Sequence, residues 1–100
     1  MRRIIFAPSF DAELLALSIS IEARFGARAA DDFETRIKHT AESVAHLPTM
    51  GGRRHGYPTA LFAIVQYPNW IFYRFTEDAV HFLHIRDGRM DKGPQSFGGN

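Results

Sequence analysis

Three apolar and aromatic runs, separated by two polar turn pairs, fill the stretch from Leu61 to Asp91, and this stretch constrains the fold most. The turn pairs are Pro68-Asn69 and Glu77-Asp78. Short runs rich in β-branched and aromatic residues, joined by so few turn residues, are typical of an antiparallel meander. The stretch therefore predicts one three-stranded sheet.

Both faces of the first predicted strand are apolar. Alternation divides its residues between the faces, with Leu61, Ala63, Val65 and Tyr67 on one and Phe62 and Ile64 on the other. An antiparallel sheet that covers only its own core usually alternates apolar with polar residues. The second face therefore requires a cover, either from this chain or from a partner.

Length and composition indicate one soluble domain. The 100 residues suffice for a single hydrophobic core, so we expect one domain over residues 1–100 with 91–100 as a flexible tail. The absence of cysteine excludes disulfides and thiolate metal sites and fits a reducing cytosol. The apolar run before Pro8 is too short for a signal peptide or a spanning helix. We expect a cytoplasmic protein that does not contact a membrane.

A short strand and two helices are predicted before the meander. Residues 4–6 are β-prone and end at Pro8, which is the length of an edge strand that could pair with the later sheet. Ser9 is expected to cap the first helix, with Asp11 and Glu13 in its first turn, where the helix dipole favours negative charge. Gly26 is expected to end it. The predicted order is β-α-α-β-β-β.

Apolar periodicity defines both helices. The first has a stripe of Phe10, Leu14, Leu17, Ile21 and Phe25, and the second has Ala30, Phe33, Ile37, Ala41, Val44 and Leu47 before Pro48. Two helices joined so tightly form an antiparallel hairpin. Leu15 and Ile19 lie off the first stripe, so a second, smaller apolar strip faces away from the main contact.

The segment TMGGRRHGYP (residues 49–58) is a loop by composition, and Arg53, Arg54 and His55 are its only charge cluster. It is either a flexible basic connection or a contact for phosphate or an acidic partner, because glycines let the backbone approach an anion that arginines then hold. The lack of a Gly-Lys-Ser/Thr signature excludes a P-loop.

Strand parity suggests one catalytic constellation. His84 and Arg86 share a face of the last strand, and Arg74 on the neighbouring strand could join them. An imidazole beside two guanidiniums suits metal-free RNA cleavage, with histidine as general acid or base and arginine for the phosphate charge. The alternative is that these groups rim the sheet and pair with nearby acids or a partner. His81, three residues from His84, should point to the opposite face, so we expect neither a metal nor a cofactor.

Several segments carry a family resemblance. They are a short first strand, the helix end ARFGARAADDF, the helix end HLPTMG, the hairpin YPNWIFYRF and the last strand AVHFLHIRDGRMD. In this order, from about Ile4 to Asp91, they resemble the RelE/ParE superfamily of toxins from type II toxin-antitoxin modules, and its ParE branch in particular. The resemblance implies an α+β fold in which an antiparallel helix hairpin packs on a small twisted antiparallel sheet.

The resemblance also implies partners and a target. A cognate antitoxin, expected to be a ribbon-helix-helix DNA-binding protein, would wrap the toxin with its C-terminal segment, and operator DNA would be contacted only through it. ParE-like members poison DNA gyrase, whereas RelE-like members cut messenger RNA in the ribosomal A site. No tyrosine follows Tyr73, and Asp87-Gly88 replaces the His-Gly pair usual in ParE. We expect a non-enzymatic gyrase inhibitor; the alternatives are a ribosome-dependent messenger endonuclease and a decayed, non-toxic homologue.

These hypotheses assign residues to three sites. The predicted antitoxin-binding residues are Leu15, Ile19, Arg53, Arg54, Phe62, Ile64 and Arg74. The predicted target-binding residues are Arg86, Arg89, Met90 and Lys92. A ribonuclease would instead use His84, Arg86 and Arg74 for catalysis.

Overall fold

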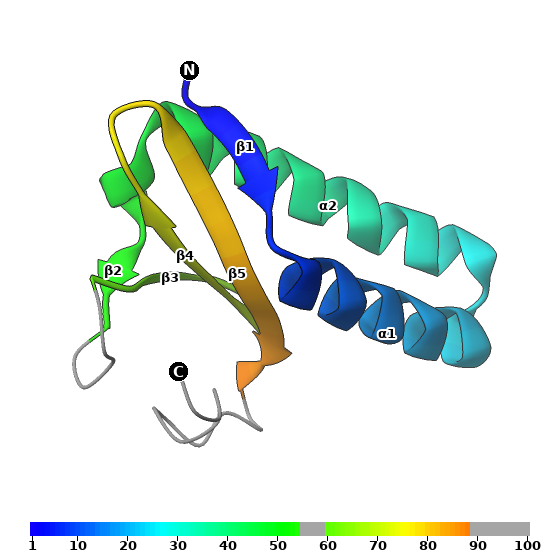
Figure 1. Ribbon diagram of the computed structural model, residues 1–100. Helices are drawn as coiled ribbons and strands as arrows, with labels where there is room; N and C mark the ends of the chain where they lie inside the picture. The colour runs from blue at the N-terminus through cyan, green and yellow to red at the C-terminus, as the bar shows by residue number, and fades with distance from the viewer. Residues whose placement is uncertain (55–59, 89–100) are drawn as a thin grey trace.

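The computed structural model describes residues 1–54 and 60–88 and places two helices on one face of a sheet (Figure 1). The elements in chain order are β1 (Arg3–Phe6), α1 (Pro8–Phe25), α2 (Ala27–His46), the 3-10 turn η1 (Pro48–Met50), β2 (Gly52–Arg53), β3 (Phe62–Gln66), β4 (Asn69–Phe75) and β5 (Ala79–Asp87). The predicted α+β class and the predicted sequence of strand, helix hairpin and meander are confirmed. The elements η1 and β2 were not predicted, because Pro48 marks the expected end of the second helix and the composition of residues 49–58 indicates a loop.

The first helix begins at Pro8, and Ser9 does not cap it. Ala7 is the N-cap residue and makes no side-chain capping bond, while Pro8 occupies the first turn, where its missing N–H has no partner to lose. The Ser9 hydroxyl instead donates to the backbone carbonyl of Leu83 at 2.7 Å. The predicted cap is wrong because a tertiary partner takes up the hydroxyl.

Gly26 alone separates the two helices, as the sequence predicts. Its φ of 96° lies in the region that favours glycine, and its N–H donates to the carbonyl of Glu22 at 2.9 Å. The buried residues of α2 are Ala30, Phe33, Ile37, Ala41, Val44 and Ala45. The predicted stripe is thus confirmed except at its end, where Leu47 is 58% exposed. In α1, Phe10 is fully buried but Phe25 is 72% exposed.

The sheet has the strand order β1-β5-β4-β3-β2. The meander β3-β4-β5 is antiparallel throughout, as predicted. The first strand does pair with the later sheet, but it runs parallel to β5, with Arg3 opposite Ala79 and Phe6 opposite Phe82. The sheet is therefore mixed rather than wholly antiparallel, because the long connection between β1 and β5 permits a parallel pair.

The helices cover the face of the sheet that holds Phe62 and Ile64. Both residues pack against the main core, which also contains Phe10, Phe33, Ile37, Ala41, Val44, Ala45, Ile71, Tyr73, Val80, Phe82 and Ile85. The other face carries a smaller cluster of Leu61, Ala63 and Phe72 with Trp70 and Leu83 beside it. The alternation of β3 is confirmed, but the assignment of Phe62 and Ile64 to a partner-facing surface is corrected: they face the helices.

Tyr73 fastens η1 and β2 to this core. Its side chain is fully buried; its hydroxyl donates to the carbonyl of Pro48 at 2.6 Å and accepts the N–H of Gly51 at 3.0 Å. Burial raises the pKa of Tyr73 above 10.0, and the bond from Gly51 opposes part of that rise. The ring and its hydroxyl therefore fix the end of α2 relative to β4.

Candidate functional site

The edge of β5 lies open where β1 ends, and α1 satisfies its backbone. The parallel pairing stops at Phe6 opposite Phe82, whereas β5 continues to Asp87. Beyond that point the hydroxyl of Ser9 binds the carbonyl of Leu83, as described above. The backbone N–H of Ile85 donates to Oε1 of Glu13 at 3.1 Å. Side chains of α1 thus replace a neighbouring strand.

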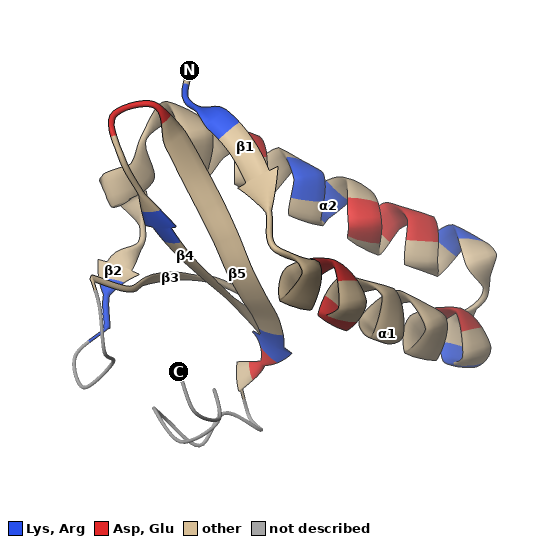
Figure 2. Ribbon diagram, viewed as in Figure 1, with Lys and Arg blue, Asp and Glu red and all other residues tan. Residues whose placement is uncertain are grey.

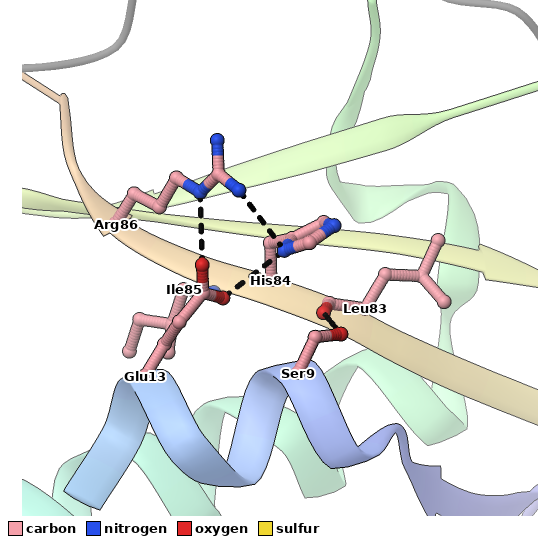
Figure 3. A network of polar contacts seen from close by, with 6 residues as sticks. All are labelled: Ser9, Glu13, Leu83, His84, Ile85 and Arg86. Carbon is pink, nitrogen blue, oxygen red and sulfur yellow. Dashed lines mark hydrogen bonds and ion pairs between the residues drawn. The ribbon is translucent and has the colours of Figure 1, made fainter. Parts of the chain in front are cut away.

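Glu13 is the centre of a polar cluster with His84 and Arg86 (Figure 3). Its Oε1 lies 3.1 Å from Nδ1 of His84, and its Oε2 accepts Nε–H of Arg86 at 3.0 Å. The three side chains are 27%, 14% and 22% exposed in the order Glu13, His84, Arg86. One carboxylate therefore receives donors from three consecutive residues of β5, counting the N–H of Ile85.

The proton on His84 follows from its neighbours. Nδ1 also lies 3.3 Å from Nη2 of Arg86, but that guanidinium nitrogen only donates. A single Nδ1 cannot donate to Glu13 and accept from Arg86 at once. We assign a proton to Nδ1, because the carboxylate is closer and is the stronger, charged acceptor. His84 is then oriented as a donor toward Glu13.

A β-bulge gives His84 its place in this cluster. The register pairs Phe72 with His84 and Tyr73 with Phe82, so Leu83 is an extra residue on β5. An extra residue shifts the alternation of the strand by one position and re-aims the side chains beside it. The cluster therefore forms next to an irregularity that strand parity does not reveal.

The bulge also changes the relation between His81 and His84. They lie opposite Arg74 and Phe72, which are two residues apart on β4 and so share a face. The expectation that a separation of three points the two histidines to opposite faces is wrong, because it assumes a regular strand. Within residues 1–54 and 60–88, no group of three His, Cys, Asp or Glu side chains is placed to hold a metal.

The arginines predicted for binding lie in different environments. Arg74 lies opposite His81 rather than His84, and its side chain is exposed, as is that of Arg53 in β2. Arg54 stacks on the ring of Trp70 at 4.2 Å, and its Nε is buried without a hydrogen-bond partner in the described part of the chain. Arg54 is therefore partly a packing residue of the sheet face that the helices leave uncovered.

Leu15 and Ile19 are exposed as predicted, at 60% each. They lie in the middle of α1, where no residue from 14 to 21 is charged, so this part of the helix is uniformly tan in Figure 2. By contrast, α2 carries both signs of charge along its length (Figure 2). The off-stripe apolar strip is thus a real feature of the surface.

The predicted target-binding residues remain to be placed, as does one residue that was not predicted. Arg86 is described above, whereas Arg89, Met90 and Lys92 lie outside the described residues. Glu13 was missed as a site residue, because its predicted position in the first turn of a helix already accounted for an acidic side chain; α1 begins at Pro8, and Asp11 is the acidic residue of its first turn. Its partners are more than 70 positions away in sequence, and nothing local in the chain indicates them.

Comparison with known proteins identifies the family. The family model described as the ParE toxin of the type II toxin-antitoxin system, parDE, matches residues 4–92. A solved structure, described as the chromosomal ParDE TA system from P. aeruginosa, superposes with a TM-score of 0.72 at 15% identity, covering 87% of this chain and 96% of that chain. A search of curated proteins found no match. Neither helix among the described residues is both long and apolar enough to cross a membrane.

At 15% identity the solved structure supports the fold alone, and the fold agrees with the family match. That match extends over most of the 100 residues and includes every helix and strand described above except the first residue of β1, Arg3. The chain belongs to the ParE toxin family of type II toxin-antitoxin systems.

Proposed function

We propose that this protein is a toxin that acts by binding DNA gyrase and is neutralised by a cognate antitoxin, without catalysing a reaction itself. The observation that favours binding over catalysis is the position of Glu13. Its carboxylate engages His84 and Arg86 together, and these are two of the three residues, with Arg74, on which a ribonuclease mechanism would depend.

Metal-free RNA cleavage makes demands that this arrangement opposes. The histidine must exchange a proton with the substrate, and the arginine must hold the charge that develops on phosphate. Here the Nδ1 proton is directed to Glu13, and the charge of Arg86 is balanced by the same carboxylate at 3.0 Å. A phosphate approaching the cluster would meet a negative group. The cluster is better suited to holding α1 against β5 than to cleaving RNA.

Antitoxin binding is supported by exposed apolar and basic groups. Leu15 and Ile19 form an uncharged strip on α1, and Arg53 and Arg74 are exposed on the sheet side of the molecule. An amphipathic, acidic segment would bury the first pair and meet the second. The antitoxin is expected to be a ribbon-helix-helix protein, and the target contact is proposed at Arg86 and the residues that follow it.

Two assays on purified protein separate the candidate activities. We expect the wild-type chain to inhibit negative supercoiling by DNA gyrase and to leave messenger RNA intact in a ribosome-dependent cleavage reaction. His84→Ala should retain gyrase inhibition. Messenger cleavage that is present in the wild type and lost in His84→Ala would establish the ribonuclease instead. Inactivity in both assays, with no growth arrest on induced expression, would indicate the decayed homologue and overturn the proposal.

The antitoxin is tested by co-expression. The candidate is the product of a short reading frame directly upstream of this gene. We expect it to co-purify with the chain at a fixed stoichiometry and to restore gyrase supercoiling when it is added in excess. A chain that is monomeric, soluble and fully inhibitory in the presence of that protein would contradict neutralisation.

A further inference from the structure

One edge of the sheet is only partly paired. The backbone N–H of Arg54 donates to the carbonyl of Leu61 at 2.8 Å, and the strand β2 pairs Gly52 with Ala63. In an antiparallel ladder, alternate residues direct their backbone N–H and C=O to the same side. Leu61, Ala63 and Val65 therefore direct these groups away from β4, toward the outer edge of β3.

Val65 is the residue on that edge that β2 does not reach. The strand β2 begins at Gly52, opposite Ala63, and the chain before it turns into η1. Within residues 1–54 and 60–88, no strand lies opposite Val65 on its outer side. The Val65 side chain is 55% exposed. The backbone N–H and C=O of Val65 thus point to the side on which a further strand could pair with β3.

A cleft lies beside this edge, and residues of β3 form one of its walls. It has a volume of about 250 Å³ and is bounded by α2 at Arg36, His39, Thr40 and Ser43 and by Met50, Ile64, Val65 and Gln66. Among these described lining residues, none is acidic. Met50 is 46% exposed and provides an apolar wall. The cleft therefore combines an open strand edge, an apolar wall and a basic rim.

A second groove continues from the first. It has a volume of about 300 Å³, lies between the helices and the β3–β4 turn, and shares Arg36 and Gln66 with the cleft. Phe25 and Tyr67, which are 72% and 80% exposed, belong to its lining. Arg24 adds a positive charge to this groove, and Asp87 at the end of β5 adds a negative one. The two depressions form one trough, referred to below as the β3 trough.

The charges of the β3 trough select among possible occupants. A second copy of this chain, paired edge to edge across Val65, would bring Arg36 of both copies to the same shared edge. Like charges so placed oppose association. Arg24 and Arg36 outnumber Asp87, the one acidic residue of the described lining. An acidic segment would therefore pair with the two arginines, while its apolar side chains would cover Met50 and Phe25.

We infer that the β3 trough binds an extended, acidic segment of a protein partner, which adds as a strand to the edge of β3 at Val65. Backbone hydrogen bonds to Val65 supply the register, and alternate side chains fit the cleft beside α2. The inference rests on the proposed function only for the identity of the partner, which is then the antitoxin.

The decisive variant is Val65→Pro. Proline at this position removes the outward N–H and leaves all hydrogen bonds between β3 and β4 in place. It is tolerated on edge strands at positions whose N–H faces outward. Val65→Thr keeps the N–H and is the matched control. Arg36→Glu reverses the charge of the trough, and Arg28→Glu, an exposed position of α2 outside the lining, controls for that reversal. Circular dichroism and thermal unfolding confirm that each variant is folded.

The first probe is a fluorescein-labelled dodecapeptide that alternates glutamate with valine, titrated by fluorescence anisotropy. We expect Val65→Pro and Arg36→Glu to bind it at least about tenfold more weakly than the wild type, a difference of about 1.4 kcal/mol. Val65→Thr and Arg28→Glu should bind as the wild type does. Equal binding by Val65→Pro, preference for a peptide with lysine in place of glutamate, or no binding to the wild type would each overturn the inference.

The second probe is the protein encoded directly upstream, co-expressed with each variant. Its loss from Val65→Pro but not from Val65→Thr would support the trough as its site. Its unchanged retention by Val65→Pro would overturn the inference while leaving the proposed function intact. Its failure to bind the wild type would overturn the proposed antitoxin, and the peptide titration would then decide the inference alone.

Discussion

Removing the carboxylate of Glu13 should separate α1 from the end of β5. In Glu13→Ala, three donors lose their acceptor: the N–H of Ile85, Nδ1 of His84 and Nε of Arg86. Glu13→Gln is the milder change, because its amide oxygen can still accept one N–H while the negative charge is lost. The two substitutions together separate the contribution of the charge from that of the hydrogen bonds.

The magnitude follows from the exposure of the three groups. Ile85 is 1% exposed, so leaving its N–H without a partner costs about 1 to 2 kcal/mol. The charged contacts are 14 to 27% exposed on their side chains, and partial screening limits each to about 0.5 kcal/mol. We expect Glu13→Ala to lose about 2 to 3 kcal/mol of unfolding free energy and Glu13→Gln about 1 kcal/mol.

Urea denaturation followed by circular dichroism measures the loss of unfolding free energy in both variants. In thermal melts, Tm should fall by about 4 to 8 °C for each kcal/mol lost in a chain of this size. Runs at low and high NaCl test the ionic part, because salt screens partly exposed charges. The deficit of Glu13→Gln should shrink at high salt. Glu22→Gln, an exposed acid on the same helix, is the control and should change stability by less than about 0.5 kcal/mol.

A Glu13→Ala protein as stable as the Glu22→Gln control would refute the reasoning. It would mean that water satisfies the edge of β5 as well as Glu13 does. A deficit in Glu13→Gln that is unaffected by salt would refute the ionic part alone.

Three further outcomes follow from buried contacts. Tyr73→Phe should lower stability by about 1 to 3 kcal/mol, measured by urea denaturation, because Pro48 and Gly51 lose their hydroxyl partner. Because the folded pKa of Tyr73 is raised, its unfolded form releases a proton first. The contribution of Tyr73 to stability should therefore be constant well below pH 10 and decline above it, so stability should fall less between about pH 9 and 11 in Tyr73→Phe than in the wild type. Gly88→Ala should cost about 1 to 3 kcal/mol, because its Cβ would lie 2.0 Å from Nε1 of Trp70; the emission of this single tryptophan reports the shift.

The elements of the fold could be predicted where the signal is local. The 3.6-residue period defines both helices, Gly26 marks the break between them, and the turn residues around Pro68 and Glu77 divide the meander. Each of these signals lies within a few residues of the structure that it specifies. The family resemblance then added the packing of the hairpin on the sheet.

What could not be predicted depends on contacts between distant residues. Alternation assigns Phe62 and Ile64 to one face but does not say which face the helices cover. Two contacts join residues about 75 positions apart: the parallel pairing of β1 with β5, and the hydrogen bond from the Ser9 hydroxyl to the carbonyl of Leu83. The bulge at Leu83 changes the parity of β5 without a glycine or proline to mark it.

The two activities considered for this family make opposite demands on Glu13. A binding toxin needs the carboxylate only to hold α1 and Arg86 against β5, so Glu13→Gln at low temperature, where the variant remains folded, should still inhibit gyrase. A ribonuclease would be restrained by it, because releasing His84 and Arg86 frees a proton donor and a phosphate-binding cation. Messenger cleavage that appears or increases in Glu13→Gln, despite its lower stability, would therefore identify the cluster as a restrained catalytic site. Cleavage absent from both proteins would leave Glu13 as a structural tie between α1 and β5.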